Sequence, residues 1–219
     1  MMQKNVIIVA GGSGSRMNSD IPKQFIPINN LPILMHTINK FYQFDKLMKI
    51  ILVLPENQID YWDKLVDIYS FKLQIEIAKG GKTRFESVKK GLAFVNDGIV
   101  GIHDAVRPFV SLQTIDNVFK LAENLGNAIP VIPVNDSVRV LSEFGNMHFD
   151  RNNVKIVQTP QCFDVDLLKK AYLQDYNNQF TDDASVVENL GIKINLTEGN
   201  VENIKITTPF DLIFAKALI

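Results

Sequence analysis

The sequence predicts an α/β fold in which a mostly parallel sheet is flanked by helices. Apolar strand-like runs alternate with helix-like segments through the first two thirds of the 219 residues, which is typical of parallel strands joined by helices. A hydrophobic content of 46% and a charged content of 21% are ordinary for a globular chain. We therefore expect a single domain over residues 1–219, large enough to bury its own core.

The elements of the first half follow from apolar runs and from the residues that interrupt them. The β-branched run that begins at Val6 indicates a buried strand, and Pro32 and Pro55 suit the first turns of two helices. We expect strands at 6–9, 49–54, 74–78 and 99–103, and helices at 32–44, 55–69, 85–94 and 112–125.

The pattern changes after a strand expected at 128–132. Ser137–Leu141 and Val154–Val157 are short alternating segments around a polar turn at Glu143–Asn146, which predicts a β-hairpin arm inserted at about 136–157. An isolated hairpin is only marginally stable, so this arm should pack on its own domain or on a second subunit.

The last part of the chain returns to alternating elements. We expect helices at about 165–173 and 182–190, strands at 192–196 and 202–208, and a final helix that begins at Pro209. On the second of these strands, Lys205 would point away from its isoleucine neighbours. Its ammonium group would then either face solvent or contact a phosphate.

Polar clusters follow three of the expected strands, at Gly11–Lys23, Gly80–Ser87 and Asp104–Arg107. Ligands of open α/β sheets bind at the carboxyl ends of strands. Glycine lets backbone N–H groups approach phosphates closely, and Arg and Lys side chains neutralise the charge. The sequence therefore predicts a site for a nucleoside triphosphate.

This site matches neither of two common phosphate-binding motifs. Met17 stands where the dinucleotide fingerprint needs its third glycine after Gly12 and Gly14. Gly81-Lys82-Thr83 resembles the end of a P-loop, but Glu76 occupies the position of the required first glycine.

Composition excludes several other classes of protein. A net charge of −1 argues against a nucleic-acid partner, and no apolar run approaches the roughly 18 residues of a membrane span. The single cysteine, Cys162, permits neither an internal disulfide nor a cysteine-based zinc site. The first strand begins within about five residues of Met1, which leaves no room for a signal peptide, so we expect a cytoplasmic protein.

The remaining chemistry favours transfer at phosphorus. The three histidines form no catalytic set, although His103 at a strand end could orient its neighbours, and the candidate serines lack a base partner. There is no dense carboxylate cluster for a dedicated metal cage, so Mg²⁺ is expected on the triphosphate, held mainly by phosphate oxygens.

Six spaced motifs resemble those of the 2-C-methyl-D-erythritol 4-phosphate cytidylyltransferases, in the right order and over almost the whole chain. They begin at Ala10, Gly80, His103, Gln158, Thr181 and Asn203 and read AGGSGSRM…PKQ, GGKTRFESV, HDAVRP, QTPQ, TDDAS and NIKIT. The resemblance implies a Rossmann-like nucleotidyltransferase fold and the transfer of CMP from CTP to a polyol phosphate in the non-mevalonate isoprenoid pathway.

The resemblance also implies roles for individual residues. Arg16, Lys23 and Lys205 would be catalytic, with the first two stabilising the transition state. The CTP-binding set would be Ala10, Gly11, Gly12, Gly14, Gly81, Ser87 and Asp104. The substrate-binding set would be Asp104, Ala105, Arg107, Ser137, Arg151, Thr159 and Thr181. In the family the arm crosses to a second subunit, so we expect a homodimer in which Ser137 and Arg151 reach the partner's site.

Two alternatives remain open from the sequence. A ribitol 5-phosphate cytidylyltransferase would share the first and third motifs, although the Thr181 motif and the Thr83–Val88 stretch favour the erythritol enzyme. A nucleotide-binding regulatory module without catalysis would not need both Arg16 and Lys23.

Overall fold

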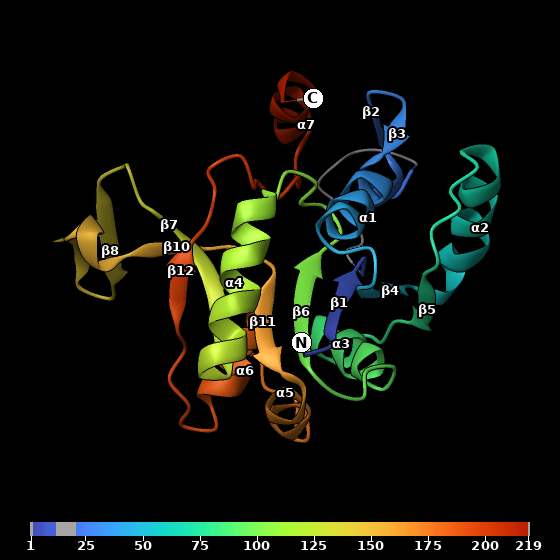
Figure 1. Ribbon diagram of the computed structural model, residues 1–219. Helices are drawn as coiled ribbons and strands as arrows, with labels where there is room; N and C mark the ends of the chain where they lie inside the picture. The colour runs from blue at the N-terminus through green and yellow to red at the C-terminus, as the bar shows by residue number, and fades with distance from the viewer. Residues whose placement is uncertain (1, 12–20, 219) are drawn as a thin grey trace.

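The computed structural model describes residues 2–11 and 21–218. Gly12, Gly14 and Arg16, to which the sequence assigns roles, lie outside the described residues. The fold confirms the predicted α/β class, with a mostly parallel sheet between helices (Figure 1).

An eight-stranded sheet forms the centre of the described structure, in the order β10-β7-β11-β6-β1-β4-β5, with β12 paired to β7. The strands are β1 (Lys4–Val9), β4 (Lys49–Leu54), β5 (Glu76–Lys79), β6 (Ile99–Asp104), β7 (Asn127–Pro133), β10 (Lys155–Val157), β11 (Gln161–Asp164) and β12 (Leu196–Glu198). Neighbouring strands are parallel from β6 through β1 and β4 to β5. No strand was predicted at the position of β11, which lies antiparallel between β6 and β7.

Helices cover both faces of this sheet, so its central strands are buried on both sides (Figure 1). The α-helices are α1 (Ile33–Phe44), α2 (Ile59–Ile68), α3 (Arg84–Leu92), α4 (Leu112–Leu125), α5 (Val165–Ala171), α6 (Asp183–Glu188) and α7 (Pro209–Ala217). Side chains of β1 alternate between two cores: Ile8 packs in a cluster with Phe41 and Phe119, and Ile7 packs in another with Val88 and Phe163. Both faces of the strand thereby hold its carboxyl end in a fixed place.

Shorter elements complete the first half. The 3₁₀ turns are η2 (Lys23–Phe25), η3 (Glu56–Gln58) and η4 (Arg151–Asn153), and β2 (Pro27–Ile28) pairs with β3 (Leu31–Pro32). The helix expected at 55–69 therefore begins as a 3₁₀ turn. Among the described residues, no helix is long and apolar enough to cross a membrane.

The predicted pairing within the arm is wrong. β8 (Val138–Ser142) pairs with β9 (Gly145–Phe149), whereas 155–157 forms β10 and pairs with β7 of the main sheet. Gly145, at φ 119°, follows a two-residue turn, so the chain reverses earlier than the apolar alternation of Val154–Val157 suggests. The β8–β9 arm projects from one edge of the sheet (Figure 1). Its apolar residues Leu141 and Phe144 are 81% and 98% exposed.

Two expected strands near the C-terminus also differ. The strand expected at 192–196 is displaced to β12, and the segment 202–208 forms no strand. Instead, the Ile206 N–H donates to the Val106 carbonyl at 3.0 Å, and Ile206 is buried. This bond places the segment beside the carboxyl end of β6. Thr208 and Asp211 then form the capping box of α7.

Candidate active site

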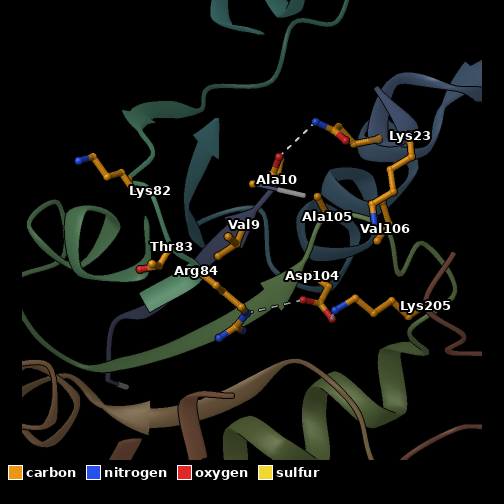
Figure 2. Close-up of a pocket in the computed structure, with 13 residues that line it drawn as sticks. Val9, Ala10, Lys23, Lys82, Thr83, Arg84, Asp104, Ala105, Val106 and Lys205 are labelled. Carbon is orange, nitrogen blue, oxygen red and sulfur yellow. Dashed lines mark hydrogen bonds and ion pairs between the residues drawn. The ribbon is translucent and has the colours of Figure 1, made fainter. Parts of the chain in front are cut away.

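A cavity of about 180 Å³ lies where β1 and β6 end (Figure 2). Its lining residues come from segments far apart in the sequence: Val9, Ala10, Gly11, Lys23, Gln24, Gly81, Lys82, Thr83, Arg84, Asp104, Ala105, Val106 and Lys205. The prediction that the three polar clusters lie together is confirmed for the described residues. Because four cationic residues and a single acidic residue line it, the cavity suits an anion.

The loop before α3 forms one wall of this cavity through its backbone. The Ser87 hydroxyl accepts from the Gly81 N–H at 3.0 Å and donates to the Thr83 carbonyl at 2.9 Å. The Thr83 hydroxyl caps α3 by accepting from the Glu86 N–H at 3.1 Å. Ser87 itself is buried and does not line the cavity, so its observed role is to hold the loop in shape.

Glycine is required at position 81 because the Glu86 side chain lies close to the backbone there. A Cβ atom at position 81 would lie 2.3 Å from the Glu86 Cβ. The Glu86 carboxylate also accepts from the Lys82 N–H at 2.6 Å, which keeps the loop against the helix. The sequence therefore needs glycine here for a close approach within the loop.

Across the cavity, η2 carries Lys23 and Gln24 toward the end of β1. The Gln24 amide donates to the Ala10 carbonyl at 3.1 Å, and the Ala10 N–H donates to the Val53 carbonyl at 2.9 Å. These bonds tie η2 and Ala10 to the sheet. Lys23 is largely buried, with 9% of its surface exposed, and lines the cavity.

Asp104, the last residue of β6, is surrounded by three cations. Its Oδ2 accepts from Arg107 Nε at 3.0 Å and lies 3.1 Å from Lys205 Nζ. Its Oδ1 lies 4.0 Å from Arg84 Nε. Figure 2 shows Arg84 and Lys205 approaching this carboxylate from opposite sides.

These contacts keep Asp104 and Arg84 charged. Burial alone would raise the pKa of Asp104, but Lys205, Arg84 and Arg107 outweigh it and hold that pKa well below its usual range. Burial would likewise lower the pKa of Arg84, and the carboxylate of Asp183 outweighs it, so this pKa lies above its usual range. The cluster therefore carries a net positive charge at neutral pH.

A second cavity, of about 300 Å³, lies on the other side of this cluster. Its lining residues are Arg84, Asp104, Arg107, Val157, Gln158, Thr159, Gln161, Thr181, Asp182 and Lys205. Arg84, Asp104 and Lys205 thus line both cavities. The predicted substrate-binding residues Arg107, Thr159 and Thr181 meet in this second cavity, whereas Ala105 lines the first.

His103 is a positioning group behind the site. Its Nε2 bonds to the Arg107 carbonyl at 3.1 Å, which only an N–H can do, so its Nδ1 accepts from the Thr159 hydroxyl at 3.0 Å. That hydroxyl oxygen in turn accepts from the Asp104 N–H at 3.1 Å. Complete burial lowers the pKa of His103 to about 4, so the ring is neutral at pH 7 and keeps this arrangement.

The predicted arm residues lie away from both cavities within this chain. Ser137 precedes β8, and Arg151 follows β9, where its guanidinium bonds to the Asn135 carbonyl. Both side chains are exposed. One chain alone therefore does not bring Ser137 or Arg151 to the site.

Arg84 and Gln161 line the site, although sequence reasoning assigned them no role. Gln161 donates to Asp182 Oδ2 at 2.8 Å and accepts from the Ala184 N–H at 2.9 Å. Both residues lie within the motifs that carry the family resemblance. Arg84 also lies in the polar cluster at Gly80–Ser87, which follows an expected strand, whereas the position of Gln161 inside its motif was the only signal for that residue.

The described residues do not form a metal cage. They contain no group of three or more His, Cys, Asp or Glu side chains that could hold a metal ion. Both oxygens of Asp104 face cations, and both oxygens of Asp182 accept hydrogen bonds, from Gln161 and from the Ser185 N–H. These carboxylates therefore fit a metal ion only if a bound substrate supplies most of the atoms that coordinate it.

Known proteins are similar to this chain in sequence and in fold over almost its whole length. A family model described as 2-C-methyl-D-erythritol 4-phosphate cytidylyltransferase matches residues 4–219. Proteins of that name from Phocaeicola vulgatus and Bacteroides thetaiotaomicron are 55% and 52% identical, and each comparison covers 100% of both chains.

Solved structures agree with the sequence comparison. The 4-diphosphocytidyl-2C-methyl-D-erythritol synthase of Anaerococcus prevotii matches with a TM-score of 0.83 at 27% identity, over 99% of this chain and 96% of that one. The 2-C-methyl-D-erythritol 4-phosphate cytidylyltransferase of Francisella tularensis matches with a TM-score of 0.81 at 32% identity, over 99% and 100%. The chain therefore belongs to the 2-C-methyl-D-erythritol 4-phosphate cytidylyltransferase family.

Proposed function

We propose that this chain transfers CMP from CTP to 2-C-methyl-D-erythritol 4-phosphate, and that its two cavities hold these two substrates. The products are 4-diphosphocytidyl-2-C-methyl-D-erythritol, an intermediate of isoprenoid biosynthesis, and pyrophosphate. Membership of the family supports the reaction. The observation that supports the assignment of cavities is that they share a wall made of Arg84, Asp104 and Lys205.

The first cavity suits the nucleotide. The backbone of Ala10, Gly11 and Gly81 supplies N–H and carbonyl groups of the kind that hold a base and phosphates, and Lys23 supplies a buried positive charge. We expect Arg16 to join Lys23 on the triphosphate, as the family resemblance implies. Both would stabilise the charge that develops on the phosphoryl oxygens and on the leaving pyrophosphate.

The second cavity suits the acceptor. Arg107 can bind a hydroxyl or phosphate oxygen, and the Thr181 hydroxyl matches a polyol. The Thr159 hydroxyl donates its proton to His103, so its oxygen can only accept from a polyol hydroxyl. The acceptor phosphate would then meet the α-phosphate of CTP near Lys205. An acceptor phosphate oxygen forms a bond to the α-phosphorus while the bond from that phosphorus to the bridging oxygen breaks, and the electron pair leaves with pyrophosphate.

We also propose that Mg²⁺ binds on the triphosphate, because the described carboxylates of the site are already paired with cations or hydrogen-bond donors. Bound there, it would neutralise charge on the leaving pyrophosphate. Titration of Mg²⁺ in a calorimeter tests this. We expect Mg²⁺ to bind to the protein when CTP is present and to show no measurable binding to the protein alone. Binding of Mg²⁺ to the protein without CTP would contradict the proposal.

The arm is proposed to complete the acceptor site of a second copy. Leu141, Phe144 and Met147 expose a run of apolar side chains that a partner could cover, and Ser137 and Arg151 reach neither cavity of their own chain. In a homodimer these two side chains would supply a hydroxyl and a cation for the acceptor phosphate. Sedimentation analysis that found only monomers at assay concentrations would contradict this.

A pyrophosphate-release assay tests the reaction itself. CTP is incubated with 2-C-methyl-D-erythritol 4-phosphate, with ribitol 5-phosphate, or without an acceptor. We expect release with the first acceptor only. Release with ribitol 5-phosphate alone would support the related ribitol enzyme, and no release with either, despite CTP binding, would favour a regulatory protein.

A further inference from the structure

Arg84 lies at the start of α3 and joins the two cavities. Its Nη1 and Nη2 donate to the two oxygens of Asp183 at 3.0 and 2.6 Å, in the bidentate geometry that fixes a guanidinium most firmly. Its Nε faces Asp104 Oδ1 at 4.0 Å. One side chain thus connects the end of β6 with the start of α6.

The carboxylate that holds Arg84 is itself fixed. Asp183 is fully buried, and its Oδ1 also accepts from the Tyr172 hydroxyl at 2.6 Å. The Tyr172 ring stacks on Phe85, with 4.6 Å between ring centroids. Because Phe85 follows Arg84 in α3, the network closes on itself, and a rotation of the guanidinium would break several contacts at once.

The elements joined in this way carry contacts for different substrates. Gly81, Lys82 and Thr83 precede Arg84 and line the first cavity, whereas Thr181 and Asp182 precede Asp183 and line the second. We propose that Arg84, held by Asp183, is a positioning residue that fixes the two bound substrates, and the Asp104 carboxylate between them, in the alignment needed for transfer. This inference rests on the proposed function.

This role predicts a particular kinetic signature. Transfer needs the attacking oxygen in line with the α-phosphorus, and a displacement near 1 Å can cost about 100-fold in rate. Each cavity would keep most of its own contacts if the connection were lost, so each substrate would still bind. The loss should therefore fall on kcat and leave both KM values nearly unchanged.

Two other roles would give different results. If Arg84 acted as a positive charge on a substrate phosphate, Arg84→Lys would retain most activity, and Arg84→Gln would raise one KM. If the Arg84–Asp183 pair served only to stabilise the fold, variants would melt at lower temperature but keep the wild-type kcat when assayed well below that temperature.

The test compares Arg84→Lys, Asp183→Asn and the double variant with the wild type. We expect each single variant to lose at least about 30-fold in kcat while both KM values stay within about threefold. The double variant should be no worse than the poorer single variant, because both changes remove the same connection. A wild-type kcat in either folded single variant, or fully additive losses in the double variant, would overturn the proposal.

Two further variants keep the test interpretable if Asp183→Asn fails to fold. Tyr172→Phe removes one bond to Asp183 and keeps the arginine–carboxylate pair, so it should lose less kcat than Arg84→Lys. Asp116→Asn breaks the exposed Asp116–Lys120 pair on α4 and should leave kcat unchanged. The activity of the wild type separates this proposal from the proposed function. If the wild type releases no pyrophosphate, the proposed function is wrong. If the wild type is active and the variants are unaffected, only the role of Arg84 is refuted.

Discussion

The ammonium group of Lys205 lies 3.1 Å from Asp104 Oδ2, although the two residues belong to segments far apart in the sequence. The bond between Ile206 and Val106 places Lys205 there, and 42% of its side-chain surface stays exposed toward the cavities. Asp104 keeps Arg107 as a second partner, so the Lys205 ammonium group could turn to a substrate phosphate without leaving the carboxylate unpaired.

Lys205→Ala is therefore expected to affect catalysis more than stability. Removal of one group that stabilises the transition-state charge should lower kcat by about 100-fold. The free energy of unfolding should fall by less than about 1 kcal/mol, because the ion pair is partly exposed to water. Steady-state kinetics and chemical denaturation measure the two effects, and Lys216→Ala, at an exposed position of α7, is the matched control. Normal turnover in Lys205→Ala would contradict the assignment.

Gly81→Ala should weaken the binding of CTP. A Cβ at this position would lie 2.3 Å from the Glu86 Cβ, so the loop must move and take its backbone N–H groups away from the nucleotide. Loss of one or two such hydrogen bonds to a charged ligand predicts a rise of at least about tenfold in the KM for CTP.

Gly80→Ala provides a graded comparison for this change. Its new Cβ would meet its nearest neighbours at 3.3 Å, which demands only a small adjustment. The rise in the KM for CTP should therefore be clearly smaller than that caused by Gly81→Ala. Equal effects would mean that the close contact with Glu86 does not determine the shape of the loop.

The convergence of the site could be predicted from the sequence because the carboxyl ends of parallel strands meet at one edge of a sheet. Gly81 follows a strand that alternation identifies and Asp104 follows one that an apolar run identifies, so their proximity needed no further information. The loop of Arg84 was placed at the site in the same way, but the orientation of its side chain could not be predicted. It depends on Asp183, whose segment reaches the site only through the packing of α5 and α6 against the sheet.

The errors in the arm and in the C-terminal segment have a common cause. Alternation of apolar and polar residues marks extended chain but does not say which strand an extended segment pairs with. Val154–Val157 alternates as expected, yet it pairs with β7. Glu202–Thr208 also alternates, and a single backbone bond to Val106 replaces a ladder.

His103 predicts a specific dependence of stability on pH. Its pKa is lowered to about 4 in the folded chain, so the unfolded chain takes up a proton first as the pH falls. The free energy of unfolding should therefore decrease between about pH 6.5 and pH 4, by an amount on the order of 3 kcal/mol, and this contribution should be constant above and below that window.

Denaturation of wild type and His103→Gln at a series of pH values measures this effect. The variant should be less stable at pH 8, because it loses a bond to Thr159 or Arg107. Its stability should nevertheless fall less steeply between pH 6.5 and pH 5, above the range in which most carboxylates titrate. Parallel curves for the two proteins would show that burial of His103 does not cause the dependence.

Mixed dimers can test whether Arg151 acts on the partner's site. Lys23→Ala should lose at least about 100-fold in rate, because a charge on the triphosphate is gone. Arg151→Ala should raise the KM for the polyol phosphate much more than the KM for CTP. When the two variants exchange subunits, half of the sites in each mixed dimer combine an intact Lys23 with an intact Arg151 from the partner. An equal mixture should therefore recover about a quarter of the wild-type activity, whereas no recovery after verified subunit exchange would place Arg151 outside the partner's site.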